Sequence, residues 1–153
     1  MPADAAGQAE SCNCLAVRMA ARRLTQFYDQ FLVPSGLRTT QFGILAKLKR
    51  LGPMTINALA EALVMDRTTL GRNILPLQRD GLVAVAQGSR DRRRKELQLT
   101  EAGAARLRSA MPAWTRAQQR FEETLGSGRA GELRSLLHTI SGGDLSPAAS
   151  AQE

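Results

Sequence analysis

The chain has 153 residues, 43% of them hydrophobic and 23% charged, and its formal net charge is +7 at pH 7. That length suits one domain with a hydrophobic core, and the apolar fraction argues against a disordered chain. The excess of arginine points to nucleic acid or another polyanion as a partner. No stretch approaches the roughly 20 apolar residues that cross a bilayer, and the first residues lack the pattern of a secretory signal. We therefore expect a cytoplasmic protein with no membrane partner.

The first structured element is predicted to be an amphipathic helix within residues 11–36. It follows residues 1–10, a small and polar stretch that we expect to be a disordered tail. Apolar side chains then recur at alternating spacings of three and four, which is typical of one face of a helix. The sequence Pro34-Ser-Gly36 ends the helix. The apolar stripe consists of Val17, Ala21, Leu24, Tyr28 and Phe31.

Three short helices are predicted next. The first begins at a Thr39-Thr40 cap, and the second runs from its cap Thr55 to Met65. The third begins at Asp66, whose carboxylate can accept hydrogen bonds from the free amides of the first turn and complements the helix dipole. Gly81 ends it.

A β-hairpin is predicted after these helices. Val83 and Val85 alternate with small residues, and Leu97 and Leu99 alternate with polar ones, which indicates two short strands. Helices followed by a basic hairpin form a winged helix-turn-helix, so we assign residues 37–100 to a DNA-binding domain of this type.

Residues 101–141 are predicted to form a long helix that starts after Thr100 and a shorter one near its end. Their apolar stripe and that of residues 11–36 exceed what one small domain can cover, so we expect both segments to form a dimerisation region. Residues 142–153 are expected to be a second disordered tail. The predicted fold class is mainly α (α+β), a winged helix-turn-helix domain with N- and C-terminal dimerisation helices. The long helix carries its stripe on Leu107, Met111, Trp114, Phe121 and Leu125, and the shorter helix spans Glu132 to Ile140.

The helix that begins at Asp66 offers polar side chains on its non-core face. Arginine binds guanine or phosphate, asparagine binds adenine, and threonine contacts phosphate or the thymine methyl group, so this face suits a major groove. A plainer interpretation is that the threonines only support the cap and that Arg72 is a solvated surface charge. The predicted DNA-binding residues of this helix are Arg67, Thr68, Thr69, Arg72 and Asn73.

The loop of the hairpin is strongly basic. Five basic side chains lie between Arg90 and Lys95, with Asp91 among them. A thin arginine-bearing loop suits the narrow, electronegative minor groove, although a charge run can also be a solvated surface. We expect Asp91 to orient a neighbouring arginine through a charge-assisted hydrogen bond. The predicted DNA-binding residues of the loop are Ser89, Arg90, Asp91, Arg92 and Arg93, and any of the three arginines could enter the groove.

Several short motifs of the chain occur together in one known family. They are Leu37-Arg-Thr-Thr-Gln-Phe42, Leu59-Ala-Glu-Ala-Leu63, Asp66-Arg-Thr-Thr69, Leu77-Gln-Arg-Asp-Gly-Leu82, Asp91-Arg-Arg93 and Leu97-Gln-Leu99-Thr100-Glu-Ala-Gly103. The combination resembles the MarR family of multiple antibiotic resistance regulators. The resemblance implies a homodimeric regulator of pseudo-palindromic double-stranded DNA, usually a repressor that a small molecule or an oxidant releases. The two recognition helices of a dimer should read half-sites about 10 base pairs apart.

The resemblance also suggests two kinds of effector. Cys14 and Tyr28 match a reactive cysteine and a supporting tyrosine in the organic-hydroperoxide-sensing branch, whereas Arg18 and Thr39 stand where that branch has further tyrosines. Fourteen helical residues span about 21 Å, so Tyr28 can approach Cys14 only across a dimer contact. The plainer interpretation, which we favour, is that Cys14 is a small hydrophobic residue of the core at the dimer interface.

The second kind of effector is a phenolic or aromatic carboxylate ligand, bound between the dimerisation helices and the winged domain. Arg18, Arg22, Tyr28 and Trp114 are candidates to line such a pocket, although for the two aromatic residues we favour a place in the core. No feature of the sequence selects one ligand.

Two other classes of protein remain as alternatives. A peroxidase-like thiol enzyme using Cys14 is disfavoured because the chain offers no nearby histidine base and no CxxC motif. We therefore expect no enzyme, no catalytic residues and no cofactor. Cys12, Cys14 and the distant His138 do not form a metal site. A non-specific architectural protein is the other alternative, in which Arg72 and Asn73 would affect affinity but not base preference.

Overall fold

The computed structural model of the chain describes residues 11–143 and 145. The tail predicted for residues 1–10 lies outside the described residues, as does most of the one predicted for 142–153. The chain divides between residues 117 and 118 into two compact units. Within the described residues, no helix is both long and apolar enough to cross a membrane.

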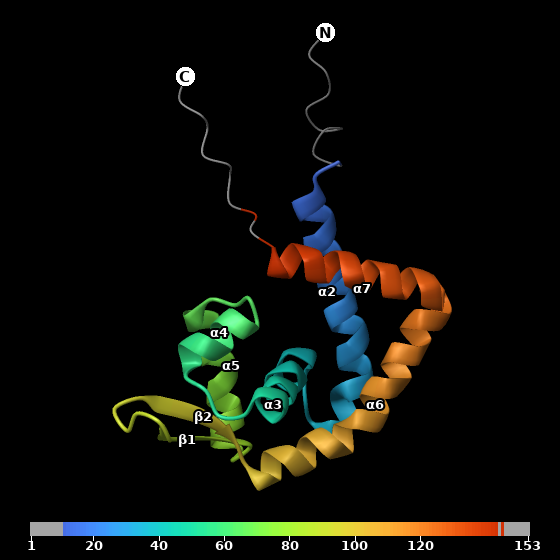
Figure 1. The fold of residues 1–153 in the computed structure, drawn as a ribbon. Coiled ribbons are helices and arrows are strands. Elements are labelled where there is room, and N and C mark those ends of the chain that lie inside the picture. Colours follow the sequence, from blue (N-terminus) through green and yellow to red (C-terminus); the bar gives the residue numbers. More distant parts are fainter. Residues whose placement is uncertain (1–10, 144, 146–153) are drawn as a thin grey trace, which may run out of the picture. The chain divides into compact units, whose positions relative to one another are not determined.

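The first unit begins with helix α2 (Asn13–Leu32), the 3-10 turn η1 (Val33–Ser35) and helix α3 (Thr39–Leu51) (Figure 1). Gly36 closes the turn with a left-handed backbone, φ 72°, a conformation that glycine adopts without steric cost. The predicted end of the first helix at Pro34-Ser-Gly36 is therefore confirmed.

The predicted Thr39-Thr40 cap is wrong. Thr39 is already the first residue of α3, and Arg38 precedes it. The backbone N–H of Arg38 donates to Gln41 Oε1 over 3.0 Å, and the backbone N–H of Thr39 donates to Asp29 Oδ1 over 2.7 Å. The backbone N–H groups at the start of α3 thus donate to a side chain later in α3 and to a side chain of α2.

Helices α4 (Ile56–Ala62) and α5 (Arg67–Arg79) form the helix-turn-helix. Both predicted caps are confirmed, because Thr55 Oγ1 accepts from the backbone N–H of Ala58 and Asp66 Oδ1 accepts from that of Thr69. Helix α4 ends three residues before Met65, the predicted end, and the turn includes Val64 at φ 50°. Gly81, at φ 71°, follows α5 as predicted.

Strands β1 (Val83–Gln87) and β2 (Lys95–Leu99) pair antiparallel, with Val83 opposite Leu99 and Val85 opposite Leu97. Met54 adds a bridge to Leu97, with hydrogen bonds of 2.8 and 3.2 Å in both directions. The predicted hairpin is confirmed, and it projects beside α5 in Figure 1.

Helix α6 (Glu101–Leu125) spans the boundary between the units and continues through Pro112. Its buried face is made mostly of small side chains, which permits close packing. Of the predicted stripe, Leu107 is buried, whereas Met111 is 40% exposed. Trp114 stacks on Phe42 with ring centroids 5.9 Å apart, at the edge of the core. The buried residues of α6 are Gly103, Ala104, Leu107, Ala110, Ala113 and Ala117.

The second unit contains the end of α6 and helix α7 (Ser127–Gly142). Helix α7 begins five residues before the predicted Glu132, directly after Gly126, whose φ is 92°. Arg134 Nη2 donates to Glu122 Oε1 over 3.1 Å and links α7 to α6. The structure as a whole confirms a mainly α fold class with one small sheet, a winged helix-turn-helix.

Candidate nucleic-acid interface

Helix α5 is anchored by one face and exposes the other. Leu70, Ile74 and Leu77 are at most 2% exposed and belong to the core. Their spacing of three and four leaves the opposite face free of core contacts. Of the side chains predicted to contact DNA, Thr68, Thr69 and Arg72 are exposed on that face, whereas Arg67, which is also exposed, and Asn73, which is half-buried, border the core stripe.

Two of these side chains also make local hydrogen bonds. Asn73 Nδ2 donates to the backbone oxygen of Thr69 over 2.9 Å, which leaves Asn73 its acceptor oxygen and a second N–H for a base. The hydroxyl of Thr69 bonds to Asp66, together with its own backbone N–H. Thr69 therefore supports the cap, as the plainer interpretation expected, and Thr68 and Arg72 are the better candidates for a groove contact.

The cap at Asp66 changes the pKa of its carboxyl group. Hydrogen bonds from the Thr69 side chain and then from its backbone N–H lower the pKa of the Asp66 carboxyl. A carboxyl whose pKa is lowered by folding stabilises the fold at pH values above its unfolded pKa. That contribution is lost as the pH falls through the lowered value, below about pH 4.

We expect Asp66→Ala to lower the melting temperature by a few degrees at pH 7, because the first turn of α5 loses its acceptor. The difference from the wild type should shrink as the pH falls through the lowered pKa of Asp66 and the wild-type carboxylate becomes protonated. Asp66→Asn should retain most of the cap at pH 7. Thermal unfolding followed by circular dichroism at several pH values measures this, and a pH-independent difference would contradict it.

The loop between β1 and β2 is a closed turn built around Asp91. The backbone N–H of Gly88 donates to Arg94 O over 2.7 Å, and that of Arg94 donates to Asp91 O over 3.0 Å. Asp91 Oδ1 accepts from the backbone N–H of Arg93 over 3.0 Å. A Cβ on Gly88 would lie 2.7 Å from Asp91 O, so the turn is compact enough to require glycine there.

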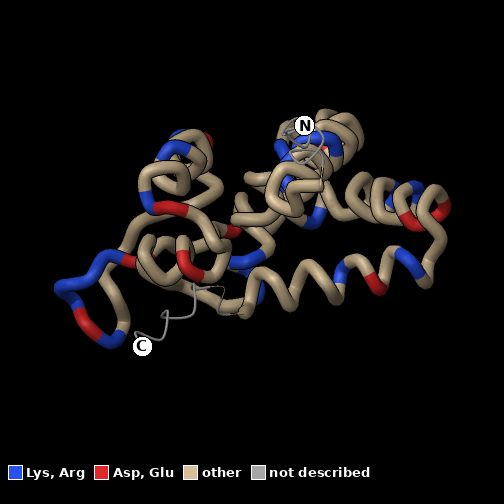
Figure 2. Tube along the Cα trace, turned by 90° about the horizontal axis from the view of Figure 1, so that it is seen from above, with Lys and Arg blue, Asp and Glu red and all other residues tan. Residues whose placement is uncertain are grey.

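The expected hydrogen bond between Asp91 and an arginine side chain takes a different form. The carboxylate bonds the backbone of Arg93, and its nearest guanidinium is that of Arg94, with Nε 3.7 Å from Asp91 Oδ2. Arg94 is not one of the predicted site residues. Asp91 therefore shapes the turn and holds Arg94 near its base, while the remaining predicted residues are exposed along the loop. These are Ser89, Arg90, Arg92 and Arg93. Figure 2 shows the basic run and its single acid.

A groove of about 310 Å³ joins the helix to the hairpin. Arg67, Gly71 and Gln78 line it from α5, and Val85 and Lys95 line it from the strands. Helix α5 therefore adjoins the hairpin, called the wing below, along this groove. Gln78 and Lys95 are not among the site residues predicted from the sequence. Gln78 could have been predicted, because it follows Arg67 and Gly71 at helical spacings of four and seven residues along the same side of α5.

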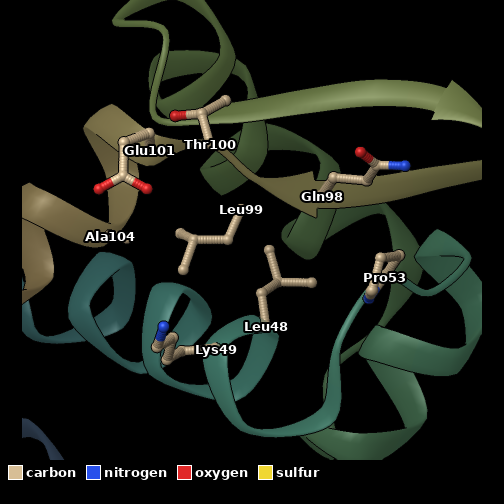
Figure 3. A pocket seen from close by; sticks show the side chains of 8 residues that line it. All are labelled: Leu48, Lys49, Pro53, Gln98, Leu99, Thr100, Glu101 and Ala104. Atoms are coloured by element: carbon tan, nitrogen blue, oxygen red, sulfur yellow. The ribbon is translucent and has the colours of Figure 1, made fainter.

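A second pocket, of about 260 Å³, lies where the end of α3, strand β2 and the start of α6 meet (Figure 3). Lys49 and Glu101 lie on its two sides, and Thr100 connects the elements: its hydroxyl donates to Gly81 O over 2.7 Å and accepts from the backbone N–H of Gly103 over 2.9 Å. This connection fixes the base of the wing against α6.

The candidate sensor residues lie on α2. Cys12 and Cys14 are exposed free thiols, and Arg18 and Arg22 are exposed. Tyr28 is half-buried, and its ring meets that of Phe27 edge-on, with centroids 5.5 Å apart. Because α2 is one continuous helix through both positions, Cys14 and Tyr28 of one chain are far apart, as expected. Among the described residues, no group of acidic, histidine and cysteine side chains could hold a metal ion.

Comparisons with known proteins agree with this geometry. Residues 37–95 match the family model described as MarR family. The chain is 32% identical over 124 residues to the HTH-type transcriptional repressor NicR of Pseudomonas putida, covering 81% of this chain and 77% of the relative.

Two solved structures are similar along most of the chain. The M. tuberculosis transcriptional regulator MosR in complex with DNA has a TM-score of 0.75 and 38% identity, covering 86% of this chain and 94% of that one. Bordetella bronchiseptica BpsR, described by the regulation of its DNA binding by 6-hydroxynicotinic acid, has a TM-score of 0.77 and 25% identity, covering 87% and 95%. The fold, the matched motifs and these relatives together show that the chain belongs to the MarR family of winged helix-turn-helix, DNA-binding transcriptional regulators.

Proposed function

We propose that the chain is a repressor that binds a pseudo-palindromic operator as a homodimer and leaves it when an effector binds. The observation that carries the proposal is that the polar side chains of α5, Thr68 and Arg72, and those of the arginine loop are exposed on two elements that adjoin along a groove lined by Arg67 and Lys95. In this proposal, Thr68, Arg72 and Asn73 face the major groove, and the loop arginines follow the adjacent minor groove.

The relatives support the finer parts of this proposal. NicR is a repressor by its name, MosR has been solved with DNA, and BpsR has its DNA binding regulated by 6-hydroxynicotinic acid. That compound is a small aromatic carboxylate, one of the two effector classes expected from the sequence.

A homodimer is supported by apolar side chains that this single chain leaves exposed. On α2, Leu15, Val17 and Met19 are 42%, 43% and 59% exposed. On α7, in the second unit, Leu136 and Ile140 are 63% and 47% exposed. Covering apolar surface stabilises by about 25 cal/mol per Å², and a second copy offers the same helices to cover both sets.

The test of this function starts from an operator selected in vitro out of a random duplex library, so that binding itself defines the site. We expect a pseudo-palindrome with half-sites about 10 base pairs apart. Arg72→Ala combined with Asn73→Ala should lower affinity for the selected operator by about 1–3 kcal/mol per lost base contact. Affinity for scrambled DNA should change much less. Fluorescence anisotropy measures both, and an equal loss on both DNAs would favour the architectural alternative.

An oxidant is the second candidate effector, because the Cys14 thiol is exposed at the start of α2. A Cys14 thiolate would attack one oxygen of an organic hydroperoxide, break the O–O bond, and give a sulfenic acid and the corresponding alcohol. We expect cumene hydroperoxide to release the selected operator from the wild type and not from Cys14→Ser. Equal responses, or no response in either protein, would remove this candidate and leave a ligand of the aromatic carboxylate class, which titration with 6-hydroxynicotinic acid probes directly.

A further inference from the structure

One carboxylate joins the N-terminal helix to the winged domain. Asp29, near the end of α2, has a side chain only 20% exposed. Its Oδ1 accepts two hydrogen bonds of 2.7 Å, from the backbone N–H and from the hydroxyl of Thr39. Its Oδ2 lies 3.6 Å from Arg38 Nη1. Three polar groups at the start of α3 thus converge on a single residue of α2.

This carboxylate serves α3 as a cap. The first amides of a helix have no partner within the helix, and a negative charge there is stabilised by the helix dipole. The residue before a helix ordinarily supplies the acceptor, but here Arg38 holds that position, and its side chain has no acceptor. The first N–H of α3 is therefore bonded to a residue of α2, and this bond requires α2 to keep its direction relative to α3.

A second contact, from α6, holds the turn between α2 and α3. Arg106 Nη1, from α6, donates to Ser35 O over 3.4 Å, and a Cβ on Gly36 would lie 3.1 Å from the same Nη1. Leu32 and Leu37, on either side of the turn, are 0% and 3% exposed. The C-terminal end of α2 is thus fixed in the winged domain, whereas its first eleven residues, 13–23, are all exposed.

We propose that Asp29 is a positioning residue that sets the direction of α2 relative to the winged domain and thereby the distance between the two recognition helices of the dimer. The inference rests on the proposed homodimer, in which α2 contributes to the contact between copies. In such a dimer, the partner holds the start of α2 and Asp29 holds its end. A rotation at the contact between Asp29 and α3 would then move α5 of one copy relative to α5 of the other. A dimer fits two half-sites best when that distance matches their spacing.

The experiment compares Asp29→Ala and Asp29→Asn with the wild type on three duplexes: one half-site, the selected palindrome, and palindromes with the spacing changed by one or two base pairs. We expect half-site affinity within about twofold of the wild type, because α5 and the wing are untouched. Affinity for the selected palindrome should fall about tenfold, with a flatter dependence on spacing. Asp29→Asn, which keeps an acceptor oxygen but loses the charge, should fall in between.

The matched control is Glu101→Gln. Like Asp29, Glu101 pairs with an arginine, Arg108, but this pair lies on the surface. The control should therefore bind all three duplexes as the wild type does. Light scattering confirms that each variant is a dimer. If Asp29→Ala does not fold, Thr39→Val decides, since it removes only the hydroxyl donor. A folded dimer with the wild-type ratio of palindrome to half-site affinity and the same spacing profile would overturn the inference. A wild type that does not prefer the palindrome would instead overturn the proposed dimeric reader, and this inference with it.

Discussion

Arg93→Ala is expected to weaken binding to the selected operator strongly while leaving the dimer and its fold intact. The side chain is exposed on the loop, and its backbone N–H is held by Asp91 Oδ1, so the truncation removes a guanidinium without disturbing the turn. One arginine contact to DNA contributes about 1–3 kcal/mol, and a dimer loses two. The affinity should therefore fall by at least about 30-fold.

The control for this prediction is Arg129→Ala, which removes the same charge from an exposed position on α7. It changes the net charge equally and should have little effect on affinity at physiological salt. Arg90→Ala and Arg92→Ala, measured in parallel, rank the three exposed arginines and identify the one that enters the groove. If Arg93→Ala binds as Arg129→Ala does, Arg93 is not a DNA contact.

Gly103→Ala is expected to destabilise the fold by about 2 kcal/mol or more, the cost of inserting an atom into a packed site. A Cβ at Gly103 would overlap the carbonyl oxygen of Leu82 and lie 2.7 Å from Leu99 Cδ1. The Leu82 oxygen cannot move freely, because it accepts a hydrogen bond of 3.1 Å from the backbone N–H of Thr100. This cost exceeds the gain of about 1 kcal/mol that alanine brings over glycine inside a helix.

The matched control is Gly131→Ala on α7, where an added Cβ meets nothing within 4 Å. That variant should be neutral or more stable, by up to about 1 kcal/mol. In thermal and urea unfolding, Gly103→Ala should therefore be less stable than the wild type, whereas Gly131→Ala should be as stable or more stable. A Gly103→Ala protein as stable as the wild type would mean that α6 does not need this close approach to the hairpin.

The elements of the winged domain are predictable because their signals are local. Thr55 and Asp66 cap helices through their own side chains, and Gly81 supplies the left-handed backbone that follows α5. Caps of this kind act within three residues of the chain, so the sequence itself displays them. The exposed face of α5 follows from the same periodicity, because Leu70, Ile74 and Leu77 mark the opposite face.

The features that the sequence does not display, among them the true start of α3, depend on partners that are distant in sequence. A Thr39-Thr40 cap is the local expectation for the start of α3, but the acceptor there is Asp29, ten residues away on another helix. Large side chains suggest the stripe on α6, yet the buried face is formed largely by alanines such as Ala110 and Ala113. Small residues give little signal in a hydrophobicity pattern, although they allow the closest packing between elements.

The sequence by itself determined the family, the mainly α fold class, the caps at Thr55 and Asp66 and the hairpin with its basic loop, because each rests on short-range spacing. Only the tertiary structure decided what Gly103 and Asp29 do. Gly103 makes room for the Leu82 carbonyl, and Asp29 ties α2 to α3. These roles depend on hydrogen-bond geometry and on the close approach of atoms between segments, and no pattern of residue types encodes such distances.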